Sequence, residues 1–74
     1  MEKLIEILSE ICPGVDFKNE TQLVDKGLID SFEMVSIVAA IMDEFDVELD
    51  VDDLLPENFN SAEAIYELIE SRRG

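Results

Sequence analysis

The sequence contains no histidine and a single cysteine among its 74 residues. Histidine is the side chain most often used for proton transfer near neutral pH, so its absence argues against acid–base catalysis by the chain itself. We therefore expect a protein that is not an enzyme. The one thiol, Cys12, cannot form an internal disulfide, which agrees with a reducing compartment. We expect Cys12 to be a small thiol at a helix end, buried or half-buried.

Basic residues are also scarce, because five Lys and Arg stand against nineteen Asp and Glu and the formal charge is −14. Such a charge repels nucleic-acid phosphates and anionic membrane surfaces and favours partners with basic surfaces. No apolar run approaches the roughly 20 residues of a membrane-spanning helix. Acidic residues also interrupt the start, "MEKLIEIL", where a signal peptide is apolar. We expect a cytoplasmic protein with no nucleic-acid partner and no membrane insertion.

The size and composition indicate one compact domain over residues 1–74, which we expect to be a monomer. Hydrophobic residues make up 47% of the chain and charged residues 32%, which is too apolar for a disordered acidic tail. So short a chain buries only a modest core, and we expect no deep catalytic cleft.

Apolar residues at helical spacing predict three main helices, over residues 2–12, 31–45 and 61–72. Pro13 and Gly14 end the first helix, and Ser61 caps the last one. Pro56 opens a short helix over residues 56–59. The predicted fold is all-α, a small bundle of three main helices and one short one. The residues expected to face its core from the main helices are Leu4, Ile5, Leu8, Ile11, Met34, Ile37, Val38, Ile41, Phe45, Ala64, Ile65, Leu68 and Ile69.

Two segments between these helices lack helical periodicity. Residues 13–30 contain turn-forming Asn19, Asp25 and Gly27 and form a long loop, a length that suggests function in so small a domain. Residues 46–55, "DVELDVDDLL", alternate acidic and aliphatic residues, but no second strand exists to pair with them, so we expect an extended loop. The loop residues expected to point inward are Val15, Phe17, Leu23, Leu28 and Ile29.

The acidic loop has acids at the spacing of a calcium-binding EF-hand loop. Its acids at the first, third, fifth, seventh and twelfth positions are Asp46, Glu48, Asp50, Asp52 and Glu57. However, Val51 occupies the sixth position, where the turn needs glycine, and Pro56 directly precedes the final glutamate. We expect no specific metal site here, only weak binding of divalent ions.

The sequence Asp30-Ser-Phe-Glu33 lies where the long loop becomes a helix. It can be a variant capping box, with Asp30 at the N-cap and Glu33 at the third helical position. Ser31 is not a self-activated nucleophile, because no histidine, nearby lysine or glycine-flanked elbow is present. Another protein can modify it, since a helix N-terminus stabilises a phosphate ester. A purely structural cap and a modified serine both remain open at this point.

The stretch Leu28-Ile-Asp-Ser-Phe32, followed by "EMVSIVAAIMDEFDVEL", resembles the attachment motif of the acyl carrier and peptidyl carrier protein family. The resemblance extends over nearly the whole chain and includes the order and lengths of the expected elements. It implies that Ser31 carries a 4′-phosphopantetheine arm through a phosphodiester and holds acyl or aminoacyl cargo as a thioester. It also implies that Asp30 assists the magnesium-dependent transfer of the arm from coenzyme A by a separate phosphopantetheinyl transferase. The further partners implied are an acyl- or aminoacyl-adenylating ligase and downstream acyl-transfer enzymes.

Two departures narrow the resemblance. Fatty-acid-synthesis carriers typically read Gly-Ala-Asp-Ser-Leu, whereas this chain reads Gly27-Leu-Ile-Asp-Ser-Phe32, which is one residue longer between glycine and serine. That spacing, the aromatic residue and the segment "LLPENFNSAEAI" are more similar to stand-alone peptidyl or D-alanyl carriers. The cargo itself is left open.

The second helix resembles the family's recognition helix, and Phe32 takes the place of a hydrophobic residue that is usually leucine. Helical geometry also places Phe32 opposite the core stripe, where an exposed aromatic suits a partner contact. Residues 27–71 contain thirteen acidic residues and no Lys or Arg, which favours fast encounter with basic partners. The alternative is a noncatalytic acidic interaction module of the same fold without an arm. The residues expected to contact partners are Phe32, Glu33, Val35, Ser36, Ala39, Met42, Asp43 and Glu44.

Overall fold

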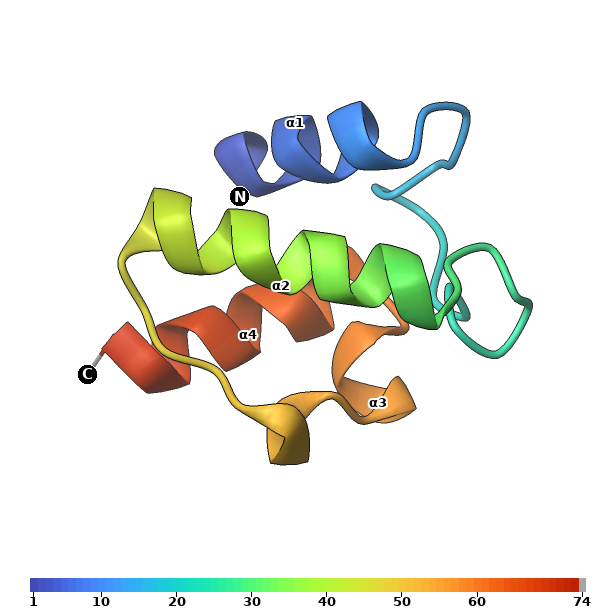
Figure 1. Ribbon diagram of the computed structural model, residues 1–74. Coiled ribbons are helices and arrows are strands. Elements are labelled where there is room, and N and C mark those ends of the chain that lie inside the picture. The colour runs from blue at the N-terminus through green and yellow to red at the C-terminus, as the bar shows by residue number, and fades with distance from the viewer. Residues whose placement is uncertain (74) are drawn as a thin grey trace.

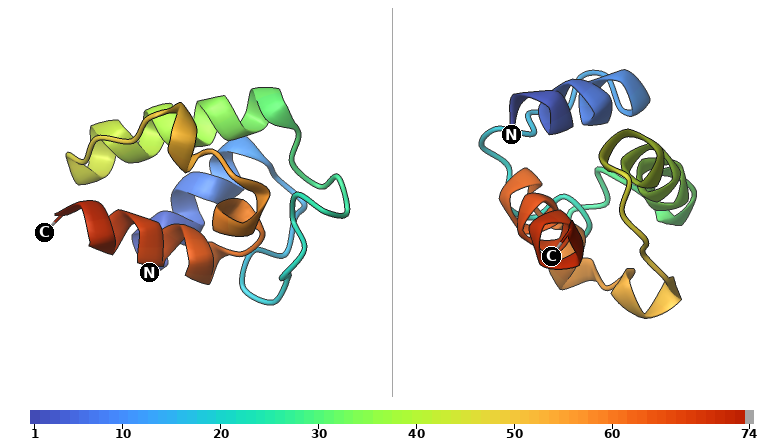
Figure 2. Two further views of the ribbon diagram at one scale, coloured as in Figure 1. Left: turned by 90° about the horizontal axis from the view of Figure 1, so that it is seen from below. Right: turned by 90° about the vertical axis from the view of Figure 1, so that its left-hand side faces the viewer.

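The computed structural model describes residues 1–73, which form an all-helical bundle without strands, as predicted (Figure 1). The four α-helices are α1 (Glu2–Ile11), α2 (Ser31–Phe45), α3 (Pro56–Phe59) and α4 (Ala62–Arg73). A single 3-10 turn, η1 (Val51–Asp53), lies between α2 and α3. Seen along the bundle, the three longer helices surround one core, and the loop of residues 13–30 crosses one end of it (Figure 2).

Local signals set the ends of the helices. The N–H of Cys12 closes α1 by donating to the Leu8 carbonyl at 2.8 Å, and the chain then turns through Gly14, whose φ of 91° suits glycine. At the start of α4, the Ser61 hydroxyl accepts a hydrogen bond from the Ala64 N–H at 3.0 Å. The sequence placed the last helix at 61–72, and it spans Ala62–Arg73.

The core combines helical and loop residues. Its largest members, all less than 2% exposed, are Leu4, Leu8, Leu23, Ile29, Ile37, Ile41, Phe59, Ile65 and Ile69. Leu23 and Ile29 come from the long loop, which is therefore part of the core. Ile7 is also buried, although the predicted stripe of α1 omitted it.

The prediction that Leu28 points inward is wrong, because its side chain is 39% exposed. The N–H groups of Leu28 and Ile29 both donate to the Leu23 carbonyl, at 2.9 and 3.2 Å. These bonds fix two successive residues in one turn, and Ile29, at 1% exposure, occupies the inward position. Leu28, the residue before it, is left at the surface.

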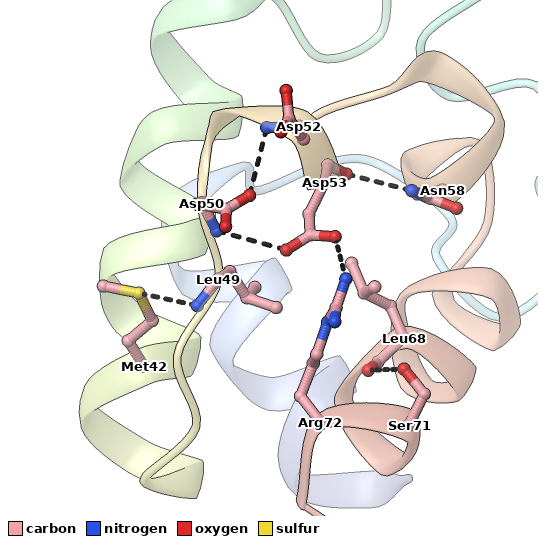
Figure 3. A network of polar contacts seen from close by, with 9 residues as sticks. All are labelled: Met42, Leu49, Asp50, Asp52, Asp53, Asn58, Leu68, Ser71 and Arg72. Carbon is pink, nitrogen blue, oxygen red and sulfur yellow. Dashed lines mark hydrogen bonds and ion pairs between the residues drawn. The ribbon is translucent and has the colours of Figure 1, made fainter.

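The acidic segment contains the 3-10 turn η1 rather than being extended throughout. The Asp50 carboxylate accepts from the Asp52 N–H at 3.2 Å, and the Asp53 carboxylate accepts from the Asp50 N–H at 3.1 Å (Figure 3). Buried Val47 anchors the segment before this turn. Capping of this kind satisfies backbone donors that an extended loop would leave to water.

Asp53 also ties η1 to the C-terminal end of α4 through an ion pair with Arg72 (Figure 3). Asp53 is buried, whereas the Arg72 side chain is half exposed. The hydrogen bond from the Asp50 N–H lowers the pKa of the Asp53 carboxyl; burial opposes this shift and the Arg72 guanidinium adds to it. The ionised carboxylate therefore holds the turn in place.

Among residues 1–73, no helix is both long enough and apolar enough to cross a membrane.

Candidate functional site

Ser31 is the first residue of α2, and it is exposed. The preceding residue, Asp30, has an extended backbone and its carboxylate accepts a hydrogen bond from the Glu33 N–H at 2.8 Å. The Glu33 carboxylate in return accepts from the Asp30 N–H at 3.1 Å. Both bonds of the predicted capping box are therefore present, and they fix the backbone on either side of Ser31.

The second oxygen of Glu33 is bonded as well. It accepts a hydrogen bond from the Cys12 thiol at 3.1 Å, which joins the end of α1 to the start of α2. Glu33 is half-buried, and its bond to Cys12 directs the side chain toward the end of α1 instead of toward the outer face expected for a partner contact. The residue lies on the side of α2 that faces α1, and its carboxylate is already engaged by Asp30 and Cys12.

Cys12 is a buried thiol at the C-cap of α1, as its position after the apolar stripe predicted. Burial raises the pKa of this thiol to about 12, and the hydrogen bond to Glu33 and the charges of Glu33 and Asp30 add to the effect. A thiol with so high a pKa stays protonated and serves as a hydrogen-bond donor rather than a nucleophile.

A hollow of about 310 Å³ adjoins Ser31. Apart from Ser31 its walls are apolar, and they come from the long loop, α2 and the segment that leads into α3. The lining residues are Val24, Ser31, Met34, Val35, Leu54 and Pro56. A larger open hollow of about 1090 Å³ lies between the start of α1, residues 17–21 and the start of α4, and none of residues 30–33 lines it.

The outer face of α2 is rich in exposed apolar surface. Phe32 is 79% exposed, Val35 60% and Met42 37%, and Ala39 and Asp43 are exposed beside them. The helical position of Phe32 opposite the core stripe predicted this exposure.

Two other residues expected on the outer face of α2, Ser36 and Glu44, are less free than the residues named above. Ser36 is half-buried, and Glu44 pairs with Lys3 of α1 at 3.1 Å, so Glu44 lies at the border with α1. Leu55 and Val51 are also exposed, at 45% and 79%, but they lie on the segment before α3 and not on α2. Residues 46–55 alternate acidic and aliphatic residues, but this pattern does not show which aliphatic side chains of a turn are buried and which are exposed.

Asn60, at the C-cap of α3, was not identified from the sequence. Its side-chain oxygen accepts hydrogen bonds from the N–H groups of Val24 and Asp25, at 2.9 and 3.1 Å. Its amide donates to the Asp25 carboxylate at 3.2 Å. These partners are more than thirty positions away along the chain, and no local pattern indicates them.

Within residues 1–73, no three His, Cys, Asp or Glu side chains are grouped so that they could hold a metal ion. In the acidic segment, the carboxylates of Asp50 and Asp53 bond to backbone N–H groups and to Arg72 instead.

Comparison with known proteins identifies the family. The family profile described as "Phosphopantetheine attachment site" matches residues 2–69, which include the Asp30-Ser31 motif. The chain belongs to this phosphopantetheine-attachment family. It is similar to the D-alanyl carrier proteins of Bacillus cereus strains B4264 and AH187 and of Bacillus anthracis strain CDC 684 / NRRL 3495. Identity to each is 26% over 74 residues, covering 97% of this chain and 94% of the relative.

Membership confirms the resemblance to carrier proteins, and the relatives agree with a type close to the D-alanyl carriers. The chain is a carrier protein, and its cofactor is covalently attached 4′-phosphopantetheine. The residues present fit such a group, because an exposed serine hydroxyl stands at a helix N-terminus beside an apolar hollow. Carrier proteins of this family interact with transferase and ligase enzymes.

Proposed function

We propose that the protein carries an acyl or aminoacyl group as a thioester on a 4′-phosphopantetheine arm attached to Ser31, and that it passes this cargo between partner enzymes. The observation that carries the proposal is the position of Ser31. Its exposed hydroxyl lies in the first turn of α2, directly after Asp30, inside the region that matches the attachment family.

The arm supplies the thiol that holds the cargo, and the chain supplies the attachment point. Attachment would form a phosphodiester at the Ser31 hydroxyl oxygen and break the pyrophosphate bond of coenzyme A, with adenosine 3′,5′-bisphosphate as the leaving group. The hydroxyl proton leaves to a base of the transferase, because the chain has no histidine to accept it. The first backbone N–H groups of α2 would stabilise the phosphodiester anion.

Asp30 assists this transfer in our proposal. Its carboxylate and that of Glu33 lie next to Ser31, where they repel the incoming phosphate groups. A magnesium ion brought by the transferase and coenzyme A would offset that repulsion. One oxygen of Asp30 accepts the capping bond from Glu33, and the second oxygen is available to the ion.

The outer face of α2 is the docking surface that we propose, with Phe32, Val35, Ala39, Met42 and Asp43 at its centre. Ser36 and Glu44 lie at its border, and Glu33 supports it from inside. A basic partner meets the acidic chain quickly and leaves it quickly, as a shuttle between several enzymes requires. D-Alanine, activated by an adenylating ligase, is the first cargo to test, because the similar Bacillus proteins are D-alanyl carriers.

We further propose that residues 1–74 form one noncatalytic domain that acts as a monomer in the cytoplasm. The lack of histidine and the raised pKa of the single thiol leave the chain few groups for catalysis. The single cysteine cannot form an internal disulfide, so the fold does not depend on an oxidising compartment.

Mass spectrometry tests the attachment. The purified protein is mixed with coenzyme A, magnesium and a broad-specificity phosphopantetheinyl transferase, and it should gain the mass of one arm. Ser31→Ala should gain none, whereas Ser36→Ala, which removes another hydroxyl of α2, should gain one. No gain by the wild type alongside a modified control carrier would favour the alternative, an acidic interaction module without an arm.

A further inference from the structure

Asn60 connects the α3–α4 junction to the long loop through both its side chain and its backbone. Besides its side-chain bonds to residues 24 and 25, its carbonyl accepts a hydrogen bond from the Leu23 N–H at 2.9 Å. Three consecutive loop residues are thus held by one asparagine.

The hydrogen bonds continue from this point toward Ser31. The Leu23 carbonyl accepts from the N–H groups of Leu28 and Ile29, at 2.9 and 3.2 Å. Leu23 and Ile29 are 0% and 1% exposed, so the core holds both of them in place. Only Asp30 separates Ile29 from Ser31, and the position of Asp30 is fixed by the capping box.

Asn60 also joins two walls of the hollow beside Ser31. Val24, whose N–H it accepts, lines the hollow from the loop. Leu54 and Pro56 line it from the segment just before Asn60. A loop that detached from Asn60 would therefore change both the hollow and the approach to the serine.

We propose that Asn60 is a positioning residue for the modification of Ser31, which rests on the function proposed above. It holds residues 23–25 against the end of α3, and the Leu23 carbonyl in turn accepts from the N–H groups of Leu28 and Ile29. Ser31 is thereby presented between exposed Leu28 and Phe32 as one preformed surface. An enzyme that docks on a loose loop must order it at the cost of affinity. The residues between Leu23 and Ile29 are half-buried or exposed, so burial alone does not hold this part of the loop.

Three variants test the role of the side chain. Asn60→Ala removes its bonds to residues 24 and 25, and Asn60→Asp places a second carboxylate against that of Asp25. In the double variant Asn60→Asp with Asp25→Asn, the amide donor lies at position 25 and the carboxylate acceptor at position 60. The side-chain hydrogen bond can then form in the opposite direction, and the net charge is unchanged. We measure arm transfer by the phosphopantetheinyl transferase at a temperature at which circular dichroism shows every variant to be folded.

The two single variants should raise KM about tenfold and leave kcat within about twofold, because the ordering cost is paid on docking. The double variant should return KM to within about threefold of the wild type. Ile69→Val is the control for stability: it trims a fully buried residue of α4, should lower the melting temperature and should leave KM unchanged.

Unchanged KM in the folded single variants would overturn the inference and leave the proposed function intact. A double variant that stays impaired, or an equal rise of KM in Ile69→Val, would also overturn it. If the wild type accepts no arm, the proposed function fails and this inference fails with it.

Discussion

Phe32 allows the docking surface to be tested with little disturbance of the fold. The side chain is 79% exposed, so of about 200 Å² only about 40 Å² is buried. At about 25 cal/mol per Å², Phe32→Ala loses about 1 kcal/mol of unfolding free energy, and the better helix propensity of alanine returns about 0.5 kcal/mol. The melting temperature should therefore change by only about 2–4 °C. Phe59→Ala, at a fully buried site, should cost about 3–5 kcal/mol.

The effect on loading should be much larger. An exposed aromatic residue that becomes the anchor of a small interface contributes about 2 kcal/mol or more, so kcat/KM for loading by the cognate adenylating ligase should fall about 30-fold. The assay compares loading of the arm-bearing wild type and the Phe32→Ala variant, alongside their thermal melts. Val51→Ala is the matched control, because Val51 is equally exposed but lies on η1 instead of α2.

Three results would refute this reasoning. Equal loading of the wild type and Phe32→Ala would remove Phe32 from the interface. The same loss in Val51→Ala would show that exposed apolar surface in general, rather than the face of α2, controls loading. A large fall in the melting temperature of Phe32→Ala would contradict the exposure on which the estimate depends.

Further predictions concern the polar groups and the charge. Folded Cys12 should resist alkylation at neutral pH, because its pKa is raised to about 12, and it should react once denaturant exposes it. Mass spectrometry measures the labelling in both states. Fast labelling of the folded protein would contradict the burial of the thiol. The lowered pKa of Asp53 stabilises the fold above the ordinary value of 3.8, and this contribution is lost as the pH falls through the folded-state pKa. Asp53→Asn should therefore melt below the wild type at pH 7. The gap should begin to narrow near pH 3.8 and close only below the folded-state pKa, and a gap independent of pH would rule out this linkage. Raising the salt from about 0.01 to 0.15 M shortens the screening length from about 30 to 8 Å, so the melting temperature of this chain of charge −14 should rise, and a flat response would show that repulsion is unimportant. Asp46→Asn should raise the melting temperature by about 2–4 °C, because it removes an acid from the negative end of α2 and asparagine tolerates the φ of 54°; a lower melting temperature would contradict this.

The sequence predicted the parts of the fold that depend on short-range order. Apolar residues recurring at helical spacing located α1, α2 and α4. The capping box of Asp30 and Glu33 was visible because its partners are three residues apart. The role of Ser31 was different, because only the family resemblance distinguished a modified serine from a structural cap.

Contacts between distant segments could not be predicted in this way. The thiol of Cys12 reaches Glu33 over 21 positions, and Asp53 reaches Arg72 over 19. Neither pair has a spacing that marks it in the sequence. Leu28 and Ile29 are both aliphatic and adjacent, and only the turn closed on Leu23 decides which of them is buried.

The two ends of α2 are held by different means, and the difference suits a carrier. At the end that bears Ser31, the backbone is fixed by the Cys12 thiol at the end of α1, by the capping box and by the loop held by Asn60. At the other end the last turn has no basic residue, and Asp43, Glu44 and Asp46 face the negative end of the helix dipole. Fifteen residues, about 22 Å of helix, separate the two ends, so a partner that contacts the acidic end does so far from the serine. We propose that the fixed end presents Ser31 to each partner enzyme in one geometry, while the charge of the acidic end attracts basic surfaces.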